Sequence, residues 1–318
     1  FDKIFDARYT SRIRFAGDAS LGFSFPFVNG SISYKIIQPD YVSLGTYYTS
    51  NNYQSLGASL STMLFRRISL SGNFSMQNDN LSKKQLYTNN GYVYSAMASY
   101  NHTCGFSISG MFNGYLQRQD DGAAVVNDTT RVNRELRSVT IMPSYSHSGE
   151  NFDHSVSLSA NYTENIDHNR FNIGMSDVQT LALGASYNLG VKPWEMDFGL
   201  SSSMQQSKGF NSKYTSVVTS LSTGRGFLKD KNLNMSASVS LCYNHVQYTS
   251  KSLSMALDLN ASYSLKQAHI FSASASFSKY GDVNPTQTRS SLDATDIRLS
   301  LNYVYTFQLL HLKKKAKK

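Results

Sequence analysis

The residues from Asn232 to Tyr280 alternate between apolar and small polar side chains with a period of two. From Leu233 to Tyr243 the odd positions are apolar or aromatic, whereas the even positions are mostly Ser and Asn. The same alternation returns from Leu253 to Tyr263 and from Phe271 to Phe277. Because successive side chains of a β-strand point to opposite faces of a sheet, each run predicts a strand with one apolar and one polar face.

Similar runs follow one another along most of the chain, and each is about ten to fifteen residues long, roughly twice the usual strand length. Beyond residue 52 we expect strands at 53–65, 68–77, 90–101, 104–117, 135–147, 152–165, 177–190, 193–206, 213–225, 232–247, 251–265, 267–280 and 292–307. Upstream, strands over Leu21–Phe27 and Ser31–Tyr48 would be joined by a two-residue hairpin at Asn29-Gly30. The segment Ile4–Phe15 is a further candidate strand.

The expected connections alternate between short and long. The short ones lie near 66–67, 101–104, 148–151, 190–193, 228–231 and 266–267. The longer ones lie near 78–89, 118–134, 166–176, 207–212, 248–250 and 281–291. Outer-membrane β-barrels have this asymmetry, with brief periplasmic turns and longer external loops. A propeller would instead show four short strands in a period of about 40 residues, where this chain has two long ones.

The composition favours a membrane protein over a soluble sheet. Charged residues make up only 16% of the chain, and Tyr and Phe number 21 and 18. No run of about 18 apolar residues is present, so the chain offers no transmembrane helix. The other spanning structure is a closed barrel. We therefore predict an all-β, transmembrane, antiparallel up-and-down β-barrel of about 16 strands, or about 14 if the first hairpin is outside the wall.

The predicted barrel covers residues 1–307, and residues 308–318 form a basic periplasmic tail. The apolar phase should face lipid, and its candidates are Leu233, Met235, Val239, Leu257, Leu259, Leu299 and Leu301. The polar phase should face the lumen, and its candidates are Asn234, Ser236, Ser238, Asp258, Asn260 and Arg298. Inward charges are few, with Glu195, Asp197 and Asp296 as the other candidates, so support for ion selection is weak. A lumen this wide would hold water, a loop such as Gln117–Arg134, or a segment of another protein.

The net charge of +9 comes with basic residues gathered near the tight turns. They include Arg66, Arg67, Lys229, Lys231, Lys266, Lys313, Lys314 and Lys315. We expect this end to lie in the periplasm, facing lipid phosphates or an acidic partner. The alternative is that these residues only keep the turns soluble. They do not form a single interleaved patch, so nucleic-acid binding is not expected.

Candidate chemistry is sparse. No GxSxG elbow, P-loop, zinc spacing or EF-hand loop is present. Cys104 and Cys242 belong to strands far apart in chain order, so a bridge between them is not expected. We predict a non-enzymatic protein without cofactor or metal, which acts as a scaffold or conduit subunit of an outer-membrane assembly or export complex. The alternatives are a porin-like channel for small solutes and a hydrolase at the lumen or rim.

Three segments carry a resemblance to a known group of proteins. They are Pro39–Tyr48, Leu64-Phe65 and Gln77–Leu81, and the closing run Tyr303 to Phe307 is similar in style. Together they resemble large outer-membrane β-barrel proteins of Bacteroidota, whereas Thr49-Ser50 departs from the pattern. The resemblance implies a bacterial outer-membrane location and a β-barrel fold. From the wide, weakly charged lumen and the basic turns we also expect protein partners in an outer-membrane complex, besides outer-membrane lipid. It implies no catalytic residues. Members of the group are longer than this chain, which implies further upstream strands or a periplasmic domain.

Overall fold

The computed structural model describes residues 14–41, 51–172, 174–228, 232–247, 250–265, 268–282 and 294–306. The strands are β1 Ala16–Ser24, β2 Val28–Ile37, β3 Tyr53–Leu64, β4 Ile68–Asp79, β5 Tyr87–Asn101, β6 Phe106–Asp121, β7 Asn133–Ser148, β8 Phe152–Asp167, β9 Val178–Val191, β10 Met196–Gly209, β11 Ser212–Phe227, β12 Leu233–Val246, β13 Ser250–Leu265, β14 His269–Asp282 and β15 Ala294–Tyr305. A 3-10 helix, η1, spans Lys192–Trp194. The candidate strand Ile4–Phe15 lies almost entirely outside the described residues, as do the tail 308–318 and most of the Pro39–Tyr48 motif.

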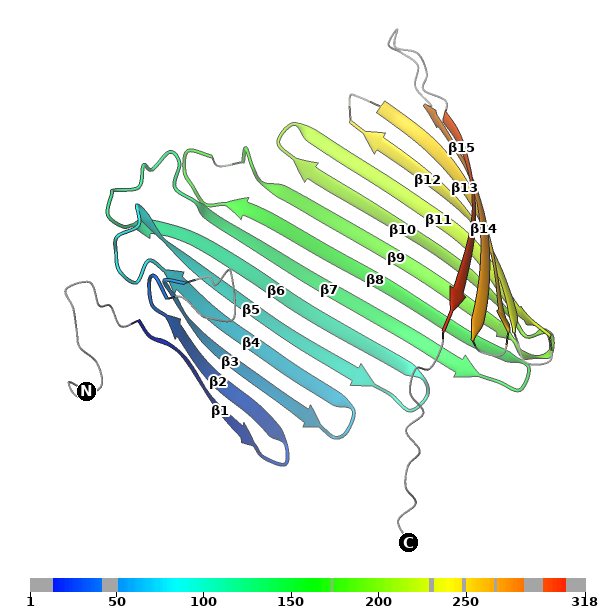
Figure 1. Ribbon diagram of the computed structural model, residues 1–318, viewed down its shortest axis with the longest axis horizontal. Coiled ribbons are helices and arrows are strands. Elements are labelled where there is room, and N and C mark those ends of the chain that lie inside the picture. Colours follow the sequence, from blue (N-terminus) through cyan, green and yellow to red (C-terminus); the bar gives the residue numbers. More distant parts are fainter. Residues whose placement is uncertain are drawn as a thin grey trace.

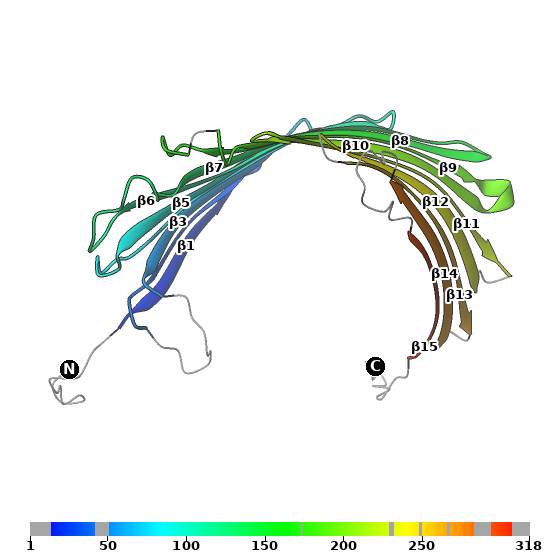
Figure 2. The ribbon, with the colours of Figure 1, turned by 90° about the horizontal axis from the view of Figure 1, so that it is seen from above.

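The strands form one antiparallel sheet whose spatial order equals the chain order, from β1 at one edge to β15 at the other (Figure 1). Seen from above, the sheet curves into an arc, with β1 and β15 at its two ends (Figure 2). In the part of the chain that the structure describes, no ladder joins β15 to β1. The prediction of an all-β, antiparallel, up-and-down sheet is therefore confirmed. The closed barrel of about 16 strands remains a prediction.

The register keeps like residues together across the sheet. In the β12–β13 ladder Val239 lies opposite Leu257, and Ser238 lies opposite Asp258. Residues directly opposite each other share a face, whereas a slip by one position would exchange the faces. The matched alternation therefore allows only registers that differ by an even number of residues, and the hydrogen bonds of each ladder select one of them. Because the sheet has no second layer, Val126 and Val191 are the only apolar side chains that are buried among the described residues.

Connections at one end of the sheet are short, and we call this the turn end. They lie between β1 and β2, β3 and β4, and each following pair up to β13 and β14. The opposite end, called the loop end, holds the connections 38–52, 80–86, 122–132 and 168–177, which are longer. One predicted loop at this end is nearly absent, because β10 and β11 extend until only Phe210-Asn211 separates them. The predicted long connection at 207–212 was therefore wrong. The connection between β12 and β13, at 247–249, lies close to the predicted 248–250.

The first hairpin also turns at a different place from the one predicted. Phe25 and Val28 exchange both backbone hydrogen bonds around Pro26 and Phe27, whereas Asn29 and Gly30 lie inside β2. Proline has no N–H and a fixed φ, so it fits a turn better than the middle of a ladder. The predicted Asn29-Gly30 turn would have required Pro26 inside a strand.

Candidate functional site

One face of the sheet carries the small polar side chains that the sequence assigned to a lumen, and we call it the polar face. Ser238 lies opposite Asp258, Asp258 lies opposite Ser276, and Ser276 lies opposite Arg298. Because opposite residues share a face, these residues form one row. The register therefore brings all six candidates onto the polar face: Asn234, Ser236, Ser238, Asp258, Asn260 and Arg298.

Serine hydroxyls pair across neighbouring strands of the polar face. The Oγ atoms of Ser107 and Ser144 lie 2.6 Å apart, as do those of Ser201 and Ser220. Similar contacts join Ser31 to Ser59, Ser69 to Ser99, Ser157 to Ser186, and Ser274 to Ser300. A hydroxyl both donates and accepts, so such pairs satisfy each other without any charge. The polar face is thus hydrophilic, and its hydrogen bonds cross from strand to strand.

Charged side chains are sparse along the middle of this face. The Arg298 guanidinium lies 2.6 Å from the Asp296 carboxylate, so these two charges offset each other. Glu195, an expected inward charge, instead follows η1 in the turn before β10, where its backbone is left-handed with φ of 49°. Rings of charged side chains are a common basis of ion selection. The described part of the polar face shows no such ring.

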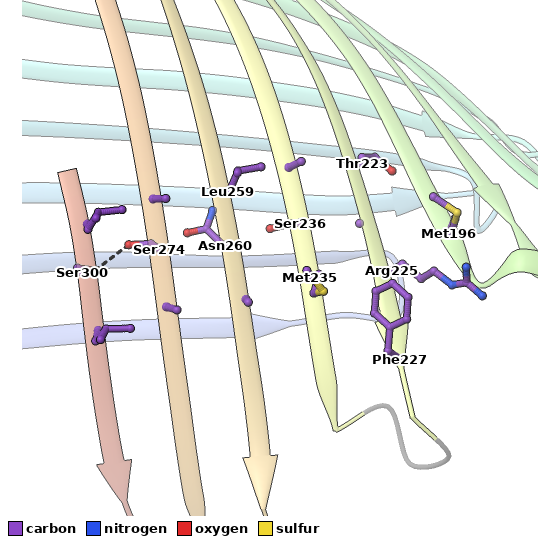
Figure 3. A pocket seen from close by; sticks show the side chains of 17 residues that line it. Met196, Thr223, Arg225, Phe227, Met235, Ser236, Leu259, Asn260, Ser274 and Ser300 are labelled. Carbon is purple, nitrogen blue, oxygen red and sulfur yellow. Dashed lines mark hydrogen bonds between the residues drawn. The ribbon is translucent and has the colours of Figure 1, made fainter. Parts of the chain in front are cut away.

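Two hollows lie near the turn end of β10 to β15. A polar hollow of about 610 Å³ is lined by Asn234, Asn260 and several serines. A groove of about 580 Å³ has mainly apolar side chains in its lining, including Met235, Leu259 and Phe227 (Figure 3). Both include residues of the same short stretches of β12 and β13. The two hollows are therefore lined by neighbouring side chains of the same strands.

The opposite face of the sheet, called the apolar face, carries the predicted lipid-facing residues. Val239 lies opposite Leu257, and Leu299 lies opposite Ala275, in the same phase as the rest of the set. The full set is Leu233, Met235, Val239, Leu257, Leu259, Leu299 and Leu301. Large side chains on this face are exposed, for example Met235 at 47%. A contiguous exposed apolar surface marks a place of contact with lipid or protein.

Aromatic and charged side chains border the apolar face. At the turn end the rings of Phe271 and Tyr303 lie 4.9 Å apart, centroid to centroid. At the loop end Arg137 lies opposite Glu164 on β7 and β8, and Lys208 lies opposite Lys213 on β10 and β11. An apolar band with aromatic and charged borders is the pattern of a membrane-spanning wall.

The basic residues of the turn end are only partly within the described residues. Arg66 and Arg67 lie in the turn between β3 and β4, as the spacing predicted, and Arg66 has a positive φ of 56°. Lys192 binds the Asp153 carboxylate at 3.1 Å and the Gly149 carbonyl at 2.7 Å. Lys229, Lys231, Lys266, Lys313, Lys314 and Lys315 lie outside the described residues.

A buried carboxylate at the loop end is hydrogen-bonded to several side chains, and sequence reasoning missed this cluster. Glu135 is only 8% exposed. Its carboxylate accepts two hydrogen bonds from Arg137, each 2.7 Å long, and one from the Tyr94 hydroxyl at 2.8 Å. His168 Nε2 lies 2.9 Å from it. The Arg137 hydrogen bonds, with those of His168 and Tyr94, lower the pKa of Glu135 to about 2, although burial opposes them.

Gly114 makes this cluster possible, because it lies between Tyr94 on β5 and Arg137 on β7. A Cβ at Gly114 would meet ring carbons of Tyr94 at 2.0 Å. The bare backbone of β6 therefore lets the Tyr94 ring lie across it and reach Glu135. Glu135 also occupies a position of the apolar phase on β7, and a charged residue in that phase is the sequence signal that was available for it.

The loop between β6 and β7 packs along the loop-end rim. The Asn169 amide, in the next long loop, donates to the backbone carbonyls of Asp128 and Arg131, both at 2.9 Å. On its other side, the backbone N–H of Ala123 donates to the Gln85 carbonyl. The ends of Gln117–Arg134 belong to β6 and β7. Residues 122–132 thus connect adjacent loops, which differs from the lumen plug considered for this segment.

Histidines and cysteines offer little further chemistry. His102 Nδ1 lies 2.9 Å from Cys104 Sγ in the exposed turn between β5 and β6. Two other histidines, His154 and His269, contact tyrosine hydroxyls at 2.8 and 2.7 Å. Both cysteines are free. The described residues contain no group of three or more potential metal ligands and no helix that is long and apolar enough to cross a membrane.

Comparison with known proteins gives structural matches only. No family model and no curated protein matches the sequence. The siderophore receptor PirA from Acinetobacter baumannii matches with a TM-score of 0.52 and 10% identity over 92% of this chain and 55% of the receptor. OmpT, an outer-membrane protein of Vibrio cholerae, matches with a TM-score of 0.42 and 8% identity over 90% of this chain and 99% of OmpT. A bacterial polysaccharide outer-membrane secretin matches with a TM-score of 0.36 and 12% identity, over 92% and 91%.

Of these three matches, the one to PirA has a TM-score above 0.5, and at 10% identity it shows a likeness of fold alone.

Proposed function

We propose that this chain forms the wall of a bacterial outer-membrane β-barrel, which acts as a non-enzymatic scaffold or conduit subunit of a protein assembly or export complex. The proposal that the sheet spans a membrane rests on the separation of the apolar face from the polar face. From β1 to β15 the same face is apolar and exposed, whereas the other carries Ser, Asn and Gly. A soluble sheet would cover the apolar face with a second layer.

The curvature agrees with a polar interior. Many serines of the polar face are half-buried, although they have no covering layer, whereas large apolar residues of the other face stay exposed. Side chains on the concave side of an arc converge and shield one another. The arc in Figure 2 closed on itself would therefore enclose the hydroxyl-lined face and present the apolar face to lipid.

The polar face supports a conduit or scaffold more than an ion-selective pore. Its hydroxyl pairs are neutral, and Arg298 and Asp296 offset each other. A neutral hydrophilic wall does not hold a particular ion, and a barrel of about 14 to 16 strands is too wide for these small side chains to fill. A segment of a partner protein is the occupant that we propose.

We further propose that the turn end faces the periplasm and the loop end faces outward. Short periplasmic turns and longer external loops are usual in such barrels. Arg66, Arg67 and Lys192 would then meet lipid phosphates or an acidic partner. The resemblance around Pro39–Tyr48 points to a Bacteroidota source.

Affinity purification from native outer membranes tests the assembly role. We expect the barrel to be recovered with protein partners, and a monomer alone would contradict this role. Planar-bilayer recording tests the second candidate, a porin-like channel, which is favoured by the hydroxyl-lined face. A steady open conductance would support the channel, and silence would support the occupied conduit.

An enzymatic role would rest on the His102–Cys104 contact, and among the described residues no third side chain is hydrogen-bonded to His102 to orient it. We expect Cys104→Ala to leave complex assembly unchanged. Loss of a lipid- or peptide-hydrolysing activity in this variant would overturn the non-enzymatic proposal.

A further inference from the structure

The apolar groove near the turn end of β10 to β15 has one charged residue in its lining, Arg225 on β11. This exposed side chain lies beside Phe227, with its guanidinium carbon 5.0 Å from the centre of the ring (Figure 3). In the described strands, Arg225 is the only Lys, Arg, Asp or Glu of the apolar face in the turn-end half. No carboxylate among the described residues pairs with it. Its guanidinium is therefore available to an anion from outside the chain.

One row of the apolar face crosses the groove from β11 to β15, because its members lie opposite one another in successive ladders. Its residues are Arg225, Met235, Ala261, Ala273 and Leu301. The two alanines leave a depression between the larger side chains on either side. A smaller apolar hollow of about 370 Å³ shares this depression and extends to the ring of Tyr263. The groove and this hollow together run from the aromatic border of the turn end toward the middle of the sheet.

The depth of this continuous groove matches one leaflet of a bilayer. On β13 its lining runs from Leu259 to Tyr263. At about 3.4 Å per residue and a strand tilt near 40°, this run covers about 10 Å of membrane depth. Half of an apolar band about 25 Å tall is roughly 12 Å. An acyl chain that lies in the groove therefore reaches from the head-group border almost to the midplane.

The charge at the border selects among the possible occupants. A phosphate group accepts paired hydrogen bonds from an arginine, so a phospholipid matches both Arg225 and the apolar groove. On the apolar face of the described strands, the acidic residues are Asp120, Glu135 and Glu164, all at the loop end. A second copy inserted in the same direction would bring none of them to Arg225. A partner's transmembrane segment would need a carboxylate of its own, which is costly within the membrane.

We infer that this groove is a binding site for one phospholipid of the periplasmic leaflet, with its phosphate on Arg225 and an acyl chain over Ala261 and Ala273. The inference rests on the proposed membrane wall, whose turn end faces the periplasm. Another hollow of the apolar face, about 540 Å³ across β3 to β7, has no charged residue in its lining. That hollow can take acyl chains but selects no head group, so it serves as an internal comparison.

Native mass spectrometry of the complete gene product, extracted from outer membranes and delipidated in detergent, tests the site. Dioleoylphosphatidylglycerol is the probe, and dioleoylglycerol has the same chains without the phosphate. We expect one phosphatidylglycerol to bind, and Arg225→Gln to weaken its binding roughly tenfold, as for the loss of a charge-assisted hydrogen bond. Ala261→Phe fills the groove and should abolish binding.

Two matched controls separate the site from the rest of the wall. Arg67→Gln removes a turn-end charge outside the groove, and Ala98→Phe fills the uncharged hollow. Both should leave the affinity for phosphatidylglycerol within about twofold of the unmodified protein. Should Ala261→Phe fail to insert into the membrane, Arg225→Gln and the phosphate-free lipid still decide the question.

Three results would overturn the inference. They are equal binding of the two lipids, unchanged affinity in Arg225→Gln, and a second copy or partner polypeptide that stays on the extracted protein and is lost in Ala261→Phe. Membrane fractionation of the same samples tests the proposed function separately. A protein absent from the outer membrane would refute the barrel, whereas an inserted protein that binds no phospholipid would refute this site alone.

Discussion

Replacing Leu257 with Arg tests the assignment of the two faces. Leu257 lies on the apolar face of β13, between Val239 on β12 and Phe277 on β14. The apolar phase of β13 runs from Leu253 to Tyr263. At about 3.4 Å per residue and a strand tilt near 40°, this run spans about 26 Å of membrane thickness. Leu257 is then about 10 Å from the loop-end border, close to the midplane.

An arginine on the lipid face near the midplane costs about 2 to 4 kcal/mol. The matched control is Asn260→Arg, which lies nearby on the polar face between Ser236 and Ser274. There the guanidinium meets water and lies two positions from Asp258, so we expect a cost below about 1 kcal/mol. The difference corresponds to at least about a fivefold gap in the folding equilibrium.

Urea-driven unfolding from lipid vesicles, followed by tyrosine and tryptophan fluorescence, measures both costs. We expect the unfolding midpoint of Leu257→Arg to fall well below that of Asn260→Arg, with similar slopes. Equal losses would refute the face assignment, and a larger loss for Asn260→Arg would show that the apolar face is the interior.

Three further changes probe the loop end and the polar face. Gly114→Ala should cost about 1 to 3 kcal/mol, because the added Cβ meets the Tyr94 ring at 2.0 Å. The control Gly72→Ala should change the unfolding midpoint little, because the atom nearest to its added Cβ is 3.7 Å away. Equal effects of the two changes would argue against the ring contact. Glu135 has a folded pKa of about 2 against an ordinary value of 4.5, so its contribution is full above about pH 4.5 and is lost as pH falls toward 2. Glu135→Gln should therefore flatten stability over this window, and an unchanged pH profile would count against the ion pair. Ser274→Ala removes one exposed hydroxyl pair and should cost less than about 1 kcal/mol in the same unfolding assay; a loss of several kcal/mol would show a structural role beyond this pair.

The alternation predicted the sheet well because it is a local signal that repeats along the chain. From Leu233 to Tyr263, side-chain phase alone places Val239 and Leu257 on one face and Ser238 and Asp258 on the other, as the ladder has them. Turn positions were less predictable. Asn29-Gly30 is a strong hairpin signal, but Pro26 three residues earlier competes for the same turn, and pairing with β3 also involves Asn29 and Gly30.

The Glu135 cluster could not be predicted because its members come from β5, β7 and the loop after β8. The sequence does not show that Tyr94, Gly114 and Arg137 fall in one row, since that row depends on the registers of two ladders. In the sequence Gly114 looks like any other strand glycine, and only the structure shows that the Tyr94 ring lies across it.

The sequence by itself determined the strand type, the two faces and the asymmetry of the ends, because each depends on alternation or on short-range turn chemistry. Tertiary structure decided the register, the loop-end cluster and the parallel direction of β1 and β15. These features depend on which strands pair and on how many strands there are, and hydrogen bonds between distant residues set both.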